Sequence, residues 1–99
     1  MNDSEKDISR ICDDIKTMLL RKNIMYGDSA LRPIRILSKS NVIEQLLVRI
    51  DDKLNRIKQG QNLIMDDEDV VSDLIGYFVL LKIAIERDVQ DAYNVGTTD

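Results

Sequence analysis

The sequence predicts an all-α fold with three main helices, and two observations support this. Apolar side chains recur at intervals of three and four residues in three segments, which is the pattern of one face of a helix. Helix-capping residues stand beside those segments, and no alternation typical of a strand fits better than the helical period. We therefore expect a single domain over residues 1–99 that assembles into an oligomeric helical bundle.

Composition limits the classes of function that the chain can have. Hydrophobic residues make up 43% of the chain, as in globular proteins. The net charge of −4 argues against duplex nucleic acid as a partner, because neutralising phosphates needs a basic surface. With no histidine and one cysteine, the chain lacks an intrachain disulfide, a histidine base and a Cys/His zinc site. The N-terminus is acidic and Lys82 interrupts the longest apolar run, so we expect a cytoplasmic protein with no membrane contact.

The first helix is expected within residues 1–22, beginning near Asp3. Its apolar stripe has helical spacing and consists of Ile8, Ile11, Cys12, Ile15, Met18 and Leu19. Because Cys12 lies on that stripe, we expect it in the core rather than at a reactive site.

Residues 23–40 are expected to form a loop. Asn23 suits a helix end, residues 26–29 have turn chemistry, and Pro33 disfavours helical angles at the residue before it. A connection this long exceeds what a bundle needs, and such connections often carry function. Several side chains in or beside it suit a phosphate and a base: Lys22, Tyr26, Ser29, Arg32 and Arg35. A purely structural loop, with Tyr26 packed on the helices, is an equal alternative.

The second helix is expected within residues 41–59, from Val42 to Lys58. Asn41 and Glu44 have the spacing of an N-terminal capping box. Arg49, Lys53 and Arg56 form a basic stripe beside the apolar face. That stripe suits either phosphate binding or a solvated flank with internal ion pairs.

The third helix is expected over residues 66–93, with the other helices packed around it and a frayed tail over 94–99. Acids at 66–69 suit the positive end of a helix, and Asp66 is the expected N-cap. From Leu74 to Ile85 apolar residues cover nearly the whole circumference, which predicts burial on every side. Two other helices cannot cover it completely. We therefore expect a homodimer or higher oligomer in which third helices meet, with ligand sites at or near the subunit boundary.

The acids offer a metal site as an alternative. Asp52 on the second helix, with Asp69 and Asp73 on the third, would supply the oxygen ligands that Mg²⁺ prefers. A metal-bound water would then attack a phosphoryl group. The same carboxylates also have structural uses, as a helix start or as acceptors for a cation. The glycines are isolated, so no phosphate-binding glycine loop is present.

Three segments carry a resemblance to a known family: KNIMYGDSAL, VRIDDKLNRI and EDVVSDLIGYFVLL. In this order they resemble the nucleotide-modification-associated domain 1 family, small helical proteins common in bacteriophages, over about residues 22–84. The matching positions are Lys22, Asn23, Tyr26, Gly27, Ser29, Arg49, Asp52, Lys53, Arg56, Glu68, Asp69, Asp73, Gly76 and Tyr77. The resemblance implies a nucleotide ligand and, for a phage protein, the host cytoplasm.

The segment SDLIGYFVLL is more distantly similar to the last helix of MazG-type all-α nucleoside triphosphate pyrophosphohydrolases. That family holds Mg²⁺ with carboxylate pairs four residues apart on two successive helices. Asp69 and Asp73 match one pair. The other pair is missing, because Glu44 is followed four residues later by Val48.

Three hypotheses follow. The favoured one is a nucleotide binder without turnover and without a cofactor, which a phage would use to sequester a host immune nucleotide signal or to manage its nucleotide pool. In it Tyr26 or Tyr77 stacks on a base, and the phosphates are held by Arg35, Arg49, Lys53 and Arg56. The alternative is a Mg²⁺-dependent pyrophosphohydrolase with ligands Asp52, Asp69 and Asp73. The third is a helical adaptor that contacts another protein and no nucleotide.

Overall fold

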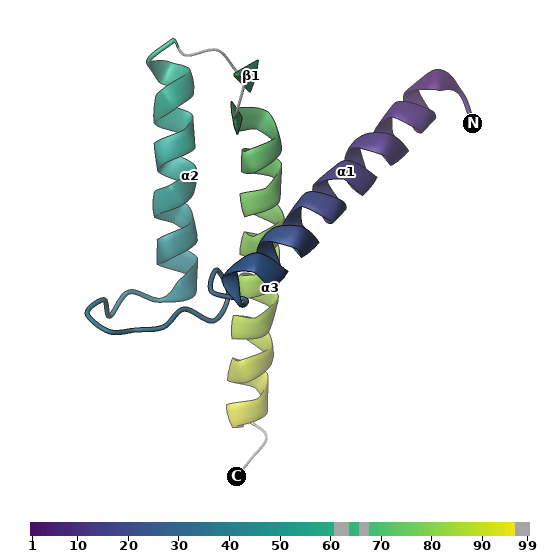
Figure 1. The fold of residues 1–99 in the computed structure, drawn as a ribbon. Helices are drawn as coiled ribbons and strands as arrows, with labels where there is room; N and C mark the ends of the chain where they lie inside the picture. Colours follow the sequence, from purple (N-terminus) through teal and green to yellow (C-terminus); the bar gives the residue numbers. More distant parts are fainter. Residues whose placement is uncertain (61–63, 66–67, 97–99) are drawn as a thin grey trace.

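The computed structural model describes residues 1–60, 64–65 and 68–96, and over them the chain is all-α as predicted. Its helices are α1 (Asp3–Tyr26), α2 (Val42–Lys58) and α3 (Val70–Gly96) (Figure 1). Between α2 and α3 lie two short strands, β1 (Ile64–Met65) and β2 (Glu68–Asp69). They pair antiparallel, with Ile64 opposite Asp69 and Met65 opposite Glu68.

Helix α1 runs one turn beyond its predicted end at residue 22. It stops at Gly27, which has φ 62° and ψ 38° and donates its backbone N–H to the carbonyl of Asn23. That left-handed geometry suits glycine, because a Cβ there is strained. The prediction that Asn23 ends the helix is therefore wrong, and Tyr26 belongs to the last helical turn rather than to the loop.

Helix α2 has the predicted bounds. The side chain of Asn41 accepts a hydrogen bond from the backbone N–H of Glu44 at 2.8 Å, which confirms the predicted N-cap. Of the apolar residues that recur at helical spacing on this helix, Leu46 and Ile50 are buried against the rest of the molecule, whereas Leu54 and Ile57 are exposed.

Helix α3 begins at Val70 rather than at residue 66, and it continues through residue 96 instead of fraying from residue 94. Asp69 takes the capping role, because its carboxylate accepts from the backbone N–H of Ser72 at 2.9 Å and from the Ser72 hydroxyl at 2.8 Å. The predicted cap, Asp66, lies outside the described residues. The predicted start at residue 66 is too early, because any of the four consecutive acids at residues 66–69 suits a helix N-terminus.

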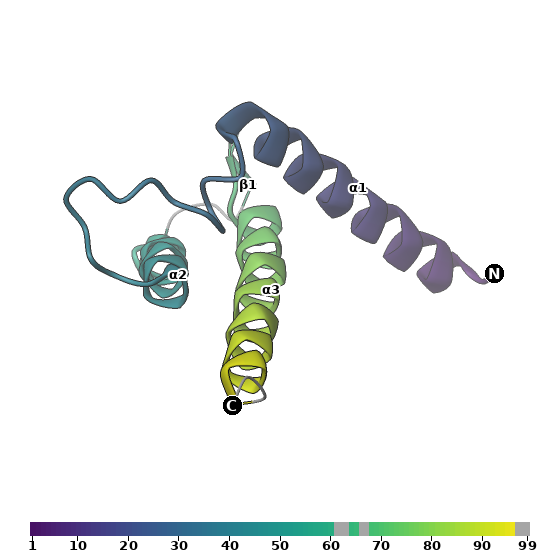
Figure 2. The same cartoon turned by 90° about the horizontal axis from the view of Figure 1, so that it is seen from below.

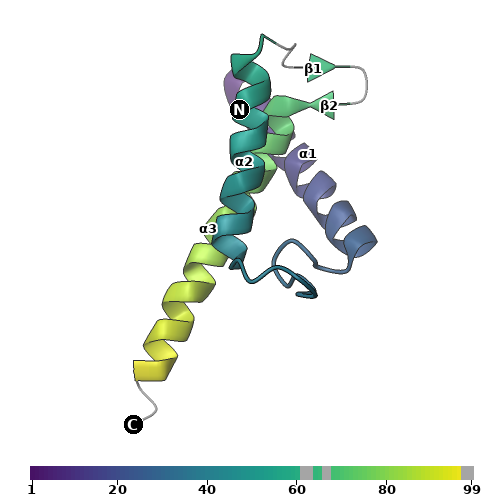
Figure 3. The same ribbon diagram turned by 90° about the vertical axis from the view of Figure 1, so that its left-hand side faces the viewer.

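Helix α3 contacts both other helices, and its contact with α2 is longer than its contact with α1 (Figures 1 and 3). The C-terminal half of α1 crosses α3, whereas its N-terminal half projects away from the other helices (Figure 2). Ile15 is therefore buried, but Ile8 and Ile11 are exposed. Cys12 is exposed too, so the prediction that it lies in the core is wrong.

The predicted burial of the third helix on every side does not occur within one chain. Apolar side chains such as Ile75, Phe78 and Ile85 remain exposed, because α1 and α2 cover only part of the circumference. Among the residues that the structure describes, the buried apolar side chains are Ile15, Leu46, Ile50, Val70 and Ala84. No helix in the described part of the chain is sufficiently long and apolar to cross a membrane.

Candidate functional site

The three helices meet at the carboxylate of Asp73. Nζ of Lys53, from α2, lies 3.1 Å from Oδ2, and Nζ of Lys22, from α1, lies 3.6 Å from Oδ1. The side chains of Asp73 and Lys53 are only 18% and 14% exposed, whereas that of Lys22 is 48% exposed. We call these residues the Asp73 cluster. One acid thus ties both neighbouring helices to α3, and one of its two cations faces solvent.

Gly76 sets how closely α1 approaches α3. A Cβ at this position would lie 3.1 Å from Cδ2 of Leu19 and 3.1 Å from Cε of Met18. The missing side chain therefore admits these two residues of α1 against the backbone of α3. Because Lys22 lies one turn after Leu19 and Asp73 one turn before Gly76, the crossing brings their side chains together.

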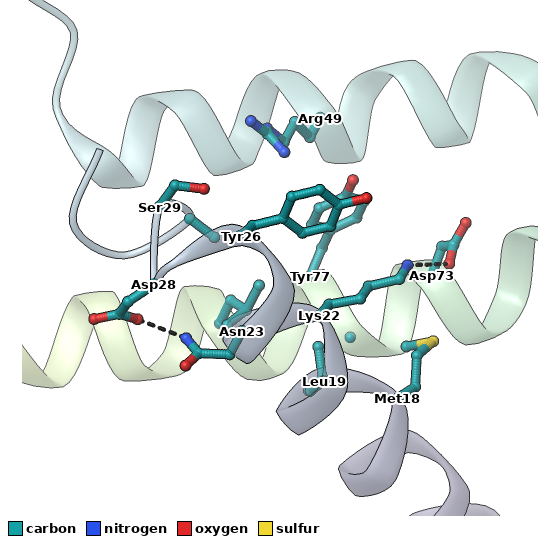
Figure 4. A pocket seen from close by; sticks show the side chains of 13 residues that line it. Met18, Leu19, Lys22, Asn23, Tyr26, Asp28, Ser29, Arg49, Asp73 and Tyr77 are labelled. Atoms are coloured by element: carbon teal, nitrogen blue, oxygen red, sulfur yellow. Dashed lines mark hydrogen bonds and ion pairs between the residues drawn. The ribbon is translucent and has the colours of Figure 1, made fainter. Parts of the chain in front are cut away.

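Beside the Asp73 cluster lies a pocket of about 430 Å³, which we call the three-helix pocket. The end of α1, the loop after it, α2 and α3 all contribute to its lining (Figure 4). Its lining residues are Met18, Leu19, Lys22, Asn23, Tyr26, Asp28, Ser29, Ala30, Arg49, Asp73, Gly76, Tyr77 and Leu80. Five of the predicted ligand-binding residues are among them: Lys22, Tyr26, Ser29, Arg49 and Tyr77.

A tight turn after α1 fixes one wall of this pocket. The side-chain amide of Asn23 donates to Oδ1 of Asp28 at 2.7 Å, and Nε of Arg32 lies 3.3 Å from Oδ2 of the same carboxylate. The backbone N–H of Ser29 donates to the carbonyl of Tyr26 at 3.3 Å. Asp28 itself has φ 64°, so two consecutive left-handed residues reverse the chain. The turn holds Tyr26 and Ser29 at the same wall.

The pocket combines cations with aromatic rings. Each of its acids is already paired, Asp73 by lysines and Asp28 by Asn23 and Arg32. Arg49 is an exposed residue and has no carboxylate partner among the described residues. The rings of Tyr26 and Tyr77 come from α1 and α3 (Figure 4). Such a site can accept an anion at Arg49 and Lys22 and a flat apolar group against a tyrosine ring.

The other predicted ligand-binding cations do not line this pocket. Lys53 points to Asp73, Arg56 lies further along α2, and Arg35 is exposed on the loop. The residues of the predicted basic stripe therefore do not act at one site. Successive turns of α2 face different parts of α3, so Arg49 lines the pocket while Lys53 contacts Asp73. Met18 and Leu19 form an apolar wall of the pocket that the sequence did not predict. The only signal for this wall is the close approach of both side chains to Gly76, which appears in the structure and not in the sequence pattern.

The three acids of the metal alternative have separate positions. Asp52 is exposed on α2, Asp73 is held by lysines, and Asp69 is bound to Ser72. The backbone N–H of Ser72, and then its hydroxyl, hold the pKa of Asp69 below its ordinary value. Within the described ranges, no group of three or more acidic or cysteine side chains is arranged to hold a metal ion.

No protein-family model, no curated protein and no solved structure matches this chain. The resemblance to the nucleotide-modification-associated domain 1 family therefore stays a prediction, and the geometry of the pocket is the basis for proposing a function.

Proposed function

We propose that the three-helix pocket binds a small phosphorylated nucleotide and releases it unchanged. One observation carries the proposal: five of the predicted ligand-binding residues, scattered from Lys22 to Tyr77 in the sequence, line a single pocket. Its volume of about 430 Å³ falls in the usual range for small-molecule sites, roughly 300–1,000 Å³.

The phosphate end of the ligand lies at Arg49 and Lys22 in this proposal. Arg49 brings a planar guanidinium that can hold two phosphate oxygens at once. Lys22 is the more exposed partner of Asp73, so it can turn toward a phosphate while Lys53 keeps the carboxylate paired. The base then stacks on Tyr26 or Tyr77, with the Ser29 hydroxyl available to hydrogen-bond the sugar or the base.

Binding without turnover is favoured over hydrolysis because the acids near the pocket are engaged in other contacts. Both oxygens of Asp73 face lysines, and both oxygens of Asp69 accept from Ser72. A phage protein of this kind would sequester a nucleotide signal or manage a nucleotide pool.

We also propose that it acts as a homo-oligomer built around α3.

The test is a panel of nucleotides, linear and cyclic, with and without Mg²⁺. Thermal shift and calorimetry measure binding, and heat release followed by chromatography identifies what was bound. Intact ligand supports the proposal, whereas pyrophosphate with a monophosphate supports the hydrolase. No shift with any nucleotide supports the adaptor.

Two arginines provide a matched comparison. Arg49→Ala removes a cation that lines the pocket, and we expect it to weaken binding about tenfold or more, as for a lost charged hydrogen bond. Arg35→Ala removes an exposed cation that does not line the pocket, so it should leave affinity unchanged. Equal effects of the two substitutions would contradict the placement of the ligand.

A further inference from the structure

Six positions on α3 form a stripe that the other helices leave exposed. Their spacing alternates between four and three residues along the helix, and the side chains are Val71, Ile75, Phe78, Lys82, Ile85 and Val89. We call this set the α3 stripe. Its exposed fractions range from 38% for Ile75 to 77% for the side chain of Lys82, with Phe78 at 52%.

The alternating spacing indicates that another helix covers the stripe. A repeat averaging 3.5 residues keeps a seam facing one partner helix over its whole length, as in coiled coils. The stripe spans nineteen residues, from Val71 to Val89, so the seam would be about 27 Å long at a rise of about 1.5 Å for each of the eighteen steps. A small ligand would need neither this length nor this regularity.

The order of side chains along the stripe makes it complementary to itself. Positions equidistant from residue 80 carry matching partners: Val71 with Val89, Ile75 with Ile85, and Phe78 with Lys82. When two copies lie antiparallel, β-branched side chains meet at both ends and an ammonium meets an aromatic ring in the middle. An ammonium over an aromatic face is an attractive pair. A two-fold axis at residue 80 repeats each contact, which is the symmetry of a C₂ dimer.

The parallel arrangement lacks this complementarity. With two helices in parallel register, each stripe residue would face its own copy, so Lys82 would meet Lys82 in an otherwise apolar seam. Placing like charges together there is unfavourable. The single charged member of the stripe thus selects the antiparallel orientation.

We propose that a second copy of this chain covers the α3 stripe in an antiparallel α3–α3 pairing, with Lys82 of each copy over Phe78 of the other. The pocket residues of α3, Asp73, Gly76, Tyr77 and Leu80, lie on the opposite side of the helix, at about 100° per residue. The two three-helix pockets therefore face outward, away from the seam. This outward placement of the pockets differs from the expectation that ligand sites lie at or near the subunit boundary. The α3–α3 pairing itself does not depend on whether a ligand is bound.

The first test measures mass in solution. Light scattering after size exclusion should give twice the 11.4 kDa of one chain. Phe78→Glu should give the monomer with unchanged circular dichroism, because residue 78 is exposed in the single chain. Leu20→Glu is the matched control, since Leu20 is an exposed apolar residue of α1 outside the stripe, and it should stay dimeric. A monomeric wild-type protein overturns the proposal.

Disulfide trapping tests the orientation in a Cys12→Ser background. A mixture of Val71→Cys and Val89→Cys chains should form the mixed disulfide on oxidation, because antiparallel pairing places residues 71 and 89 together. Neither variant alone should cross-link, since identical positions lie about 27 Å apart along the seam. Dimers of Val71→Cys alone would indicate parallel pairing and overturn the proposal.

Ligand binding separates this inference from the proposed function. The monomeric Phe78→Glu variant should retain nucleotide affinity per chain, because its pocket lies on the other side of α3. A dimer that binds no nucleotide would leave the pairing intact and contradict only the function. Loss of nucleotide affinity in the folded monomer would instead contradict the outward placement of the pockets.

Discussion

Nζ of Lys53 lies 3.1 Å from Oδ2 of Asp73, although the two residues come from different helices and are separated by two short strands in the sequence. The other oxygen of Asp73 faces Lys22 of α1 at 3.6 Å. A single carboxylate thus joins all three helices beside the pocket. The stability of the helix arrangement and the shape of the pocket should therefore respond together to changes at Asp73.

Replacing Asp73 tests this connection. Asp73→Ala removes the acceptor that both lysines share, and the Lys53 side chain is only 14% exposed to solvent. We expect the free energy of unfolding to fall by about 1–3 kcal/mol, measured by urea denaturation. Glu86→Ala is the control, because it removes the exposed Lys82–Glu86 pair within α3 and should cost less than about 0.5 kcal/mol. Equal losses would show that the Asp73 cluster contributes no more than a surface pair.

Gly76 should tolerate no large side chain. Gly76→Val places atoms against Leu19 and Met18, where even a Cβ would lie 3.1 Å from each. We expect a loss of about 1–3 kcal/mol in urea denaturation, together with weaker nucleotide binding, because α1 must move away from α3. Ala92→Val introduces the same side chain at an exposed position of α3, and there it should change stability by only a few tenths of a kcal/mol.

Two glycines with positive φ allow the turn after α1 to be tested. Gly27 and Gly60 have φ of 62° and 79°, and a Cβ at either would meet nothing within 4 Å. Alanine at either position should therefore cost about 1–2 kcal/mol through backbone strain alone. Only Gly27→Ala should also weaken nucleotide binding, measured by calorimetry, because Gly27 orients Tyr26 and Ser29 at the pocket wall. Weaker binding in both variants would contradict a specific role of that turn.

Acid should weaken the start of α3. Hydrogen bonds from Ser72 lower the pKa of Asp69 in the folded protein, so the unfolded chain binds this proton more tightly. The stabilisation is complete well above the unfolded pKa of about 3.9 and is lost as the pH falls through the lower folded value. Asp69→Asn keeps a capping side chain but removes the charge, so its thermal midpoint should fall less steeply below about pH 5. Asp51→Asn, at an exposed position of α2, should follow the wild-type curve.

The fold class and the limits of α2 could be predicted because their signals are local. Asn41 caps α2 through a residue three positions away, and Leu46 and Ile50 are buried as their spacing predicts. The end of α1 at Gly27 and the start of α3 after Asp69 also depend on local chemistry. Their predicted positions are wrong because neighbouring residues have the same capping chemistry. Any acid of residues 66–69 is suited to cap α3, and Asn23 is suited to end α1, although Asp69 and Gly27 are the residues that do so.

Local patterns along the chain are enough to predict three helices, their apolar faces and a set of residues suited to phosphate and base recognition. Which of these residues share a pocket depends on how the helices pack: Arg49 lines the pocket, Lys53 contacts Asp73, and Arg35 is exposed to solvent. The reason is that periodicity describes one helix at a time, whereas the pocket depends on where α1 crosses α3. The missing side chain of Gly76 sets that crossing, more than fifty residues along the chain from Lys22.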